Sequence, residues 1–310
     1  ITHKLDEVMR FADRVTVLRE GRVIATHDSA QPDKAALVRE MVGREVLFQP
    51  QKEAITPGPV VLALRGVHAT GSHGLPALRD VSFDVRSGEI LGVAGVAGNG
   101  QQELAEIITR LRPVAEGQMW IGEREITHAS PLDAIRAGVG HIPADRLGMG
   151  LAGNMTVADN LIMKGYRREP LSNGQVLSPR AIRGYARRLV DLFRIATPSV
   201  RTPVRTLSGG NLQKAILARE LDAAPRLLVA VHPTRGLDIG AMESVHQHLL
   251  AQRSAGTAIL LISEDLDELL VLADRIAVLY EGRIMGIVDA EAAEVEEIGL
   301  MMAGESIQAD

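Results

Sequence analysis

The chain has 310 residues, 46% of them hydrophobic and 24% charged, and a formal net charge of −5. This size and composition are typical of a globular protein with a sizeable core, and the acidic balance argues against nucleic acid as the main partner. The absence of cysteine excludes disulfides and thiolate metal sites, and no apolar run approaches the roughly 18 residues of a membrane-spanning helix.

The beginning of the chain resembles a later part of the same chain. Ile1–Ala25 aligns without gaps with Ile262–Gly286 at an offset of 261 residues, and twelve of the 25 positions are identical. A duplication explains a match of this length. We therefore expect residues 1–47 to be the end of one domain, residues 60–304 to be a complete second copy and residues 305–310 to be a tail. The chain is then expected to be a fragment of a longer protein.

Between the two copies the composition changes twice. Residues 48–59 are polar and rich in proline, which is typical of a linker. Residues 60–90 are short, turn-rich segments, which favour an antiparallel sheet. The apolar run at residues 89–96 is short and precedes a glycine loop, so we expect a buried strand there.

Apolar residues spaced three and four apart predict two helices. The first follows Gly100. Its apolar positions are Leu104, Ile107, Ile108 and Leu111. The second begins with Ser178 as N-cap and Pro179 at its first position. Its apolar positions are Ile182, Tyr185, Ala186, Leu189 and Phe193.

Three further apolar runs, at residues 226–231, 258–263 and 275–280, are expected to be buried parallel strands, since each adjoins a helical segment. Alternating strands and helices predict an α/β layered fold. In such folds, phosphate chemistry lies at the carboxyl ends of the strands.

The stretch LGVAGVAGNGQQEL, Leu91–Leu104, resembles a phosphate-binding loop between a strand and a helix. Glycines let backbone N–H groups turn toward a phosphate, and the helix N-terminus favours the anion. Gly95 and Gly100 fit the pattern G-x-x-x-x-G-K-[ST], but Gln101 and Gln102 stand where it requires a lysine and a hydroxyl. Taken alone, the loop also fits a tight turn that binds no ligand.

A second motif, Leu207-Ser208-Gly209-Gly210, opens a helix and could offer a hydroxyl and backbone N–H groups to a terminal phosphate. It is followed by the apolar strand and turn RLLVAVHPTRGLD, which ends at Asp238. The ordered set of glycine loop, LSGG, PTRGLD and final strand–turn resembles the ATP-binding-cassette (ABC) ATPases over residues 60–304. Residues 1–47 resemble the end of a preceding cassette.

This resemblance implies a P-loop NTPase core with a parallel sheet, an antiparallel β subdomain and a helical signature subdomain. It implies ATP and Mg²⁺ as cofactors, and ATP hydrolysis by the full-length protein. His3 matches the family's switch histidine, which contacts the γ-phosphate, and would belong to the first cassette.

The second copy departs from the family at the polar groups that handle ATP. The family's glutamine after the next strand falls near Ala144. The other substituted positions are Gln101 for the lysine, Gln102 for the magnesium-binding hydroxyl, Val231 for the magnesium-binding Asp, His232 for the general base and Glu264 for the switch histidine. Phosphoryl transfer depends on the metal, the lysine charge and an oriented water together. We therefore expect a degenerate site with no metal, weak or absent ATP binding and an inactive isolated fragment. The degenerate site would comprise Gly95, Gly98, Asn99, Gly100, Gln101, Gln102, Val231, His232 and Glu264.

In this family two cassettes pair head to tail, and each signature closes over the partner's ATP. Ser208, Gly209, Gly210 and Asp238 are therefore expected to act in trans on the intact site of a first cassette in the same chain. A tandem cassette whose second phosphate-binding loop lacks the lysine resembles the ATPase of bacterial sugar importers. The segments PTRGLDIGA and SGGN are similar to the nucleoside relatives of that group.

The importer resemblance implies a place on the cytoplasmic side of the membrane. Its partners would be transmembrane permease subunits and, through them, a periplasmic or lipoprotein solute-binding protein, with residues 147–168 facing the permease. Two alternatives stay open. One is a non-transport cassette protein, although such relatives tend to carry intact paired sites and basic or coiled-coil insertions. The other is a structural cassette that never touches nucleotide.

Overall fold

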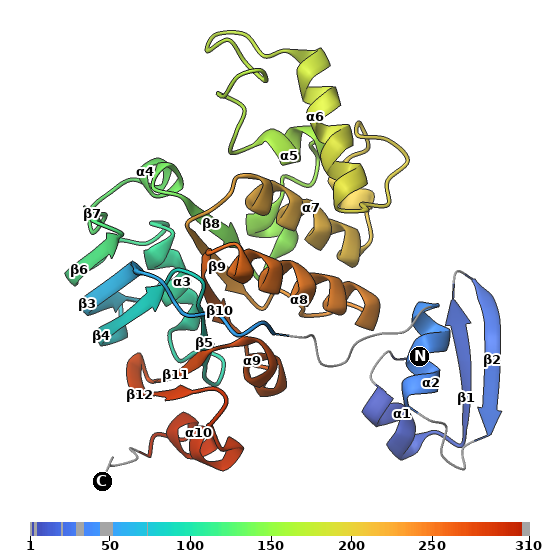
Figure 1. The fold of residues 1–310 in the computed structure, drawn as a ribbon, viewed down its shortest axis with the longest axis horizontal. Helices are drawn as coiled ribbons and strands as arrows, with labels where there is room; N and C mark the ends of the chain where they lie inside the picture. Colours follow the sequence, from blue (N-terminus) through green and yellow to red (C-terminus); the bar gives the residue numbers. More distant parts are fainter. Residues whose placement is uncertain are drawn as a thin grey trace.

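The structure is a computed structural model that describes residues 2, 5–19, 21–28, 34–43, 52–72 and 74–305. His3, residues 48–51 of the predicted linker and residues 306–310 lie outside this part of the chain. A six-stranded mixed sheet forms the centre of the main body, and a four-stranded antiparallel sheet packs beside it (Figure 1).

The central sheet has the order β12-β11-β5-β10-β9-β8. Its strands are β5 (Ile90–Ala94), β8 (Val139–Ile142), β9 (Leu227–Val231), β10 (Ala258–Ile262), β11 (Arg275–Tyr280) and β12 (Arg283–Asp289). All neighbours are parallel except β11 and β12. Every residue of β5, β9 and β10 is buried, because both faces of the sheet are covered, and this explains their unbroken apolar sequences. The predicted parallel strands are confirmed.

The antiparallel sheet has the order β4-β3-β6-β7. Its strands are β3 (Val60–Thr70), β4 (Pro76–Arg86), β6 (Glu116–Ile121) and β7 (Arg124–Glu125). This sheet shares one apolar core with a face of the central sheet and with α3 (Gln101–Ile108). Three of the four predicted apolar positions of α3 are fully buried, but Leu111 is 53% exposed. The helix ends earlier than predicted because Arg110 adopts a left-handed conformation with φ 63°.

Helices cover the other face of the central sheet and form a separate lobe. In Figure 1, α5 (Val157–Ile162) and α6 (Pro179–Leu192) stand at the top, above α7 (Gly209–Asp222) and α8 (Ile239–Ser254). The Ser178 hydroxyl caps α6 by accepting from the Ala181 N–H at 3.4 Å, as predicted. The main body also contains the helices α4 (Pro131–Arg136), α9 (Leu266–Leu272) and α10 (Val295–Met302), a π-helical turn η1 (Arg146–Gly150) and a 3₁₀ turn η2 (Val204–Thr206). Among the described residues, no helix combines the length and apolarity needed to cross a membrane.

The N-terminal unit reproduces the end of the main body. It consists of α1 (Leu5–Phe11), β1 (Arg14–Arg19), β2 (Arg22–Asp28) and α2 (Lys34–Val42). At the offset of 261 residues these elements coincide with α9, β11, β12 and α10. Both hairpins have the same register, since Arg14 pairs with Asp28 and Arg275 with Asp289. In each hairpin the register shifts between the fourth and fifth residues of the first strand. The duplication is therefore a structural repeat.

The two repeats differ in what surrounds them. Strand β11 pairs with β5 on its second edge and is mostly buried, whereas β1 pairs with β2 alone among the described strands and has a single buried residue. The unit has a small core around Leu37 and Val38, and Val42 lies against the first turn of α8. Strand β1 thus corresponds to an inner strand of the central sheet, but it has no counterpart of β5 beside it among the described strands.

The described end of the predicted linker is bound to the main body. Lys52 donates to the Ala273 carbonyl at 2.6 Å and pairs with Asp274 at 2.9 Å. Arg253, which is 3% exposed, donates to the Glu53 carbonyl and holds both oxygens of Asp274 at 2.7 and 2.8 Å. Asp274 also accepts from the Ile90 N–H at the start of β5. One carboxylate therefore joins the linker, α8 and the central sheet.

Asp274→Ala should destabilise the main body by about 3–5 kcal/mol, because it leaves the buried Arg253 guanidinium without its partner. Urea unfolding followed by circular dichroism measures the effect. Asp13→Ala is the matched control, since Asp13 occupies the equivalent repeat position but is exposed, and should change stability by less than about 0.5 kcal/mol. Equal effects of the two substitutions would contradict this role of Asp274.

Candidate functional site

The glycine loop joins β5 to α3, as the sequence predicted. Gly98 and Gly100 have φ values of 91° and 106°, in the region that favours glycine. A Cβ on Gly100 would also lie 2.6 Å from the Ala77 carbonyl oxygen. Gly95 and Asn99 hold the loop against the β11–β12 turn: a Cβ on Gly95 would meet the Leu279 carbonyl, and the Asn99 side chain accepts from the Glu281 N–H at 3.0 Å.

Two glutamines follow the loop, at the positions where a phosphate-binding loop has a lysine and a hydroxyl. Their side chains are bonded within the protein and do not replace those groups. Gln101 is 6% exposed and donates to the Val96 carbonyl of the same loop at 3.0 Å. It therefore closes the loop upon itself. Gln102 points along α3 and donates to Glu106 at 2.8 Å. Neither side chain brings a positive charge to the loop.

A cavity of about 290 Å³ opens beside the loop. Its walls are the loop with α3 on one side and the segments after β8, β9 and β10 on the other. The lining residues are Ala97, Gly98, Gln101, Gln102, Ala105, Glu106, His141, Pro143, Ala144, Asp145, Met149, Val231, His232, Arg235 and Glu264. Three carboxylates line the cavity. Arg235 is the one lysine or arginine among the described lining residues. Such a balance disfavours a polyphosphate.

Histidines add no charge to this cavity at neutral pH. His232 follows β9 and adopts φ 44°, and its Nε2 lies 3.9 Å from Glu264. Burial lowers the pKa of His232 more than the nearby Glu264 raises it. Burial and the neighbouring Lys164 lower the pKa of His141 to about 4. Both imidazoles are therefore neutral.

The residues do not fit a magnesium ion. Val231, at the end of β9, has no side-chain oxygen, and Gln102 is bonded to its own helix. Within the described residues, no group of three or more His, Cys, Asp or Glu side chains is arranged to hold a metal. We therefore assign no metal-dependent step to this cavity.

The second set of predicted residues lies at the starts of α7 and α8. Ser208 is exposed at the N-terminus of α7, and its hydroxyl accepts from the Asn211 side chain at 2.8 Å. Asp238 caps α8 by accepting from the Ala241 N–H at 2.8 Å. A Cβ on Gly210 would touch Ala241 at 3.4 Å, so the two helix starts are neighbours. Gly209 and Gly210 are half-buried there.

The predicted site residues thus form two groups. Those at residues 95–102, 231, 232 and 264 form or line the cavity, and Ser208, Gly209, Gly210 and Asp238 form a surface outside its lining. His3 lies outside the described residues. The two groups do not combine into one site within the described part of the chain.

Arg146 connects the two groups and was not predicted as a functional residue. Its Nε donates to Gln213 on α7 at 2.8 Å, and its Nη2 donates to the Arg235 carbonyl in the loop before Asp238. The signal available in the sequence was its position in the segment PADR, directly after the cavity residues Pro143, Ala144 and Asp145.

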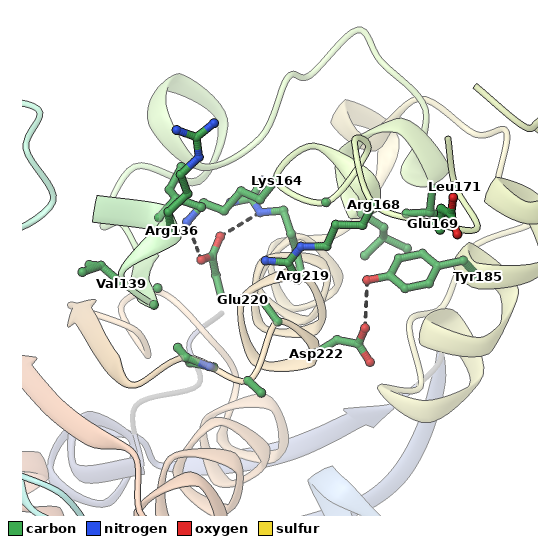
Figure 2. Close-up of a pocket in the computed structure, with 18 of the residues that line it drawn as sticks. Arg136, Val139, Lys164, Arg168, Glu169, Leu171, Tyr185, Arg219, Glu220 and Asp222 are labelled. Carbon is green, nitrogen blue, oxygen red and sulfur yellow. Dashed lines mark hydrogen bonds and ion pairs between the residues drawn. The ribbon is translucent and has the colours of Figure 1, made fainter. Parts of the chain in front are cut away.

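A second cavity, of about 350 Å³, lies between the α5–α6 lobe and the main body (Figure 2). At its floor Lys164 pairs with Glu220 at 2.5 Å, and the same carboxylate accepts from the His141 N–H and from Arg219. Glu220 is 1% exposed. Burial raises its pKa, but the charges of Lys164 and Arg219 outweigh this effect and keep the pKa below its usual value. The ion cluster therefore joins α7 to β8 and to the lobe.

The lowered pKa of His141 predicts a loss of stability in mild acid. Because the unfolded chain binds a proton near pH 6.5 and the folded chain near 4, stability should fall as pH decreases through this range, by about 2 kcal/mol between pH 7 and 5. His141→Gln should remove this part of the loss, measured as Tm against pH. The exposed His128→Gln is the control, and identical pH profiles for both variants would refute the assignment.

Comparison with known proteins identifies the same family as the motifs do. The family described as "ABC transporter" matches residues 78–235. The glucose import ATP-binding protein TsgD13 of Haloferax volcanii is 46% identical over 306 residues, which are 98% of this chain and 56% of that protein. The guanosine import ATP-binding protein NupO of Bacillus subtilis is 44% identical over 94% of this chain and 57% of that protein. The chain thus spans somewhat more than half the length of these curated relatives.

Solved structures share the fold at low sequence identity. A nucleotide-free ATP-binding cassette from an ABC transporter matches with a TM-score of 0.63 and 20% identity, covering 80% of this chain and 96% of that one. A dimeric cassette in a post-hydrolysis state, bound to ADP and Pi, matches with a TM-score of 0.63 and 21% identity, covering 75% and 100%. The predicted fold class is confirmed, and the chain belongs to the ABC transporter family, of which it carries an ATP-binding domain.

Proposed function

We propose that this chain is part of the ATP-binding subunit of a membrane importer for sugars or nucleosides, at the cytoplasmic side of the membrane. The observation that carries the proposal is the match over nearly the whole chain to proteins named for the import of glucose and guanosine. A protein named for ribose import, from Rubrobacter xylanophilus, is also 40% identical over 98% of the chain.

In this proposal the cavity of the second cassette is a degenerate nucleotide site. Gln101 is bonded to its own loop, three carboxylates line the cavity, and Val231 lacks a metal-binding oxygen. Backbone N–H groups of the loop could still hold ATP weakly, since one charge-assisted hydrogen bond is worth roughly 1.5–3 kcal/mol. Hydrolysis needs the missing groups together, so this cavity and the isolated chain are inactive in ATP turnover.

The surface of Ser208, Gly209, Gly210 and Asp238 then serves a different ATP molecule. It would close over an intact site on a first cassette of the same chain, where His3 also belongs and where ATP and Mg²⁺ supply the phosphoryl chemistry. Two observations support this pairing: the signature surface lies outside the degenerate cavity, and the N-terminal unit repeats the end of a cassette down to the hairpin register.

The cavity in Figure 2 is proposed as the docking place of the permease. It lies between the lobe and the main body, and the predicted docking segment, residues 147–168, contributes to its wall. Four apolar side chains of the same segment, none of them in the lining of this cavity, are exposed. They are Leu147 at 44%, Met149 at 48%, Met155 at 46% and Met163 at 37% exposure. A solute-binding protein would be reached through the permease. The net charge of −5 argues against nucleic acid as a partner.

Two alternatives make different predictions. A non-transport cassette protein would hydrolyse ATP without any response to a permease. A purely structural cassette would tolerate substitutions at Ser208, because no ATP would contact its signature. The importer reading requires both the permease response and the signature.

Ser208→Arg should reduce ATP turnover of the full tandem protein with its membrane partners by at least about a hundredfold, because bulk and charge would block closure over the partner's ATP. ATP binding to the first cassette should persist, as measured by equilibrium dialysis. Ser178→Arg, the same change at the N-cap of α6, is the control and should retain turnover. Unchanged turnover in Ser208→Arg would eliminate the composite site.

Restoring the lysine and the hydroxyl after the glycine loop should increase the affinity of the degenerate cassette for ATP. Gln101→Lys together with Gln102→Thr should tighten ATP binding to the degenerate cassette by about ten- to a hundredfold, since it adds a charge-assisted hydrogen bond. Fluorescent-nucleotide titration measures the affinity, with Gln102→Thr alone as control. An unchanged dissociation constant would mean that the carboxylates of the cavity, rather than the missing lysine, limit binding.

A further inference from the structure

One buried carboxylate, outside both groups of site residues, contacts three separate segments. Glu268 of α9 is 5% exposed. One of its oxygens accepts from the Thr234 hydroxyl at 2.7 Å and lies 3.0 Å from His246 Nε2, and the other accepts from the Ser263 hydroxyl at 2.6 Å. These partners are 34, 22 and five residues away in sequence.

Each of the three segments leads directly to a site residue. Thr234 lies in the loop between His232 and Asp238, and its carbonyl accepts from the Leu237 N–H. Ser263 immediately precedes Glu264, and its hydroxyl accepts from the Asp265 N–H at 3.1 Å. His246 lies on α8, the helix that Asp238 caps. Glu268 therefore joins the loop, the turn and the helix behind the signature surface.

The carboxylate is charged at neutral pH. Burial raises the pKa of Glu268, but hydrogen bonds from His246, Ser263 and Thr234 outweigh it and hold the pKa below its usual value. Thr234 and Ser263 are themselves 7% and 4% exposed, so their hydroxyls have little access to water. Loss of the acceptor would leave buried donors unpaired and the three segments free to separate.

We propose that Glu268 is a positioning residue for the composite ATP site: it fixes the loop at residues 232–238 and the turn at residues 263–265 in one conformation. Asp238 is then held beside the signature without help from a nucleotide in the degenerate cavity, where ATP would bind weakly at most. This inference rests on the proposed function, because it assumes that Asp238 and Ser208 act on the partner's ATP.

The test compares ATP turnover of the full tandem protein, assembled with its membrane partners, in wild type and Glu268→Gln. Glutamine keeps the size of the side chain, but its NH₂ group faces a hydroxyl donor. We expect kcat to fall at least about tenfold with KM changed less than about twofold, as expected when geometry is lost but ATP binding is kept.

Glu89→Gln is the matched control. Glu89 is 2% exposed and accepts from Arg275 and from the Arg86 N–H, but it lies at the amino end of β5, away from the site. Its loss of charge should lower Tm to a comparable extent and leave kcat within about twofold. An equal fall of kcat in both variants would show a merely structural role and overturn the proposal.

Two further measurements keep the test decisive if Glu268→Gln folds poorly. Thr234→Val and Ser263→Ala each remove one hydroxyl, and each should lower kcat in the wild type but have no further effect in the Glu268→Gln background. Additive effects would overturn the proposal. If Ser208→Arg abolishes turnover while Glu268→Gln leaves it intact, this inference alone fails; if Ser208→Arg has no effect, the composite site fails with it.

Discussion

The whole arrangement depends on three parallel strands, β5, β9 and β10, that are buried on both faces. Burial of every residue requires unbroken apolar runs, so polar chemistry can only begin where these strands end. The glycine loop, His232 and Glu264 all lie at those carboxyl ends. Substitution of polar groups there leaves the apolar interior untouched, which is how a cassette can keep its fold while its cavity loses the groups that bind charge.

The signature surface follows from a second constraint, the rigidity of α7. This helix has 14 residues and is therefore about 21 Å long. Its first turn adjoins Ser208, and its last turn carries Glu220 and Asp222 into the cavity of Figure 2. In the proposed importer, one rigid element thus connects the permease side to the surface that would close over the partner's ATP, and the Lys164–Glu220 pair fixes the lobe to that element.

Local sequence patterns predicted most of the fold. The apolar runs, the helix caps and the offset of 261 residues were readable because each depends on neighbouring residues or on identity within the chain. The early end of α3 was missed because it depends on the backbone conformation of Arg110 rather than on apolar spacing. The closure of Gln101 on Val96 and the convergence on Glu268 were missed because tertiary contacts decide them: Thr234 and Glu268 are 34 residues apart.

The asymmetry between the repeats gives the degenerate cavity a physical meaning. His3 of the first copy aligns with Glu264 of the second, which lies 3.9 Å from His232. Because burial keeps His232 neutral, this pair supplies no positive charge for a γ-phosphate. An ordinary cassette could order its loops around the charge of a bound nucleotide and metal. In the proposed degenerate cavity these charges are weak or absent. We therefore propose that the order of the loops comes from within the protein, through the buried, ionised carboxylate of Glu268.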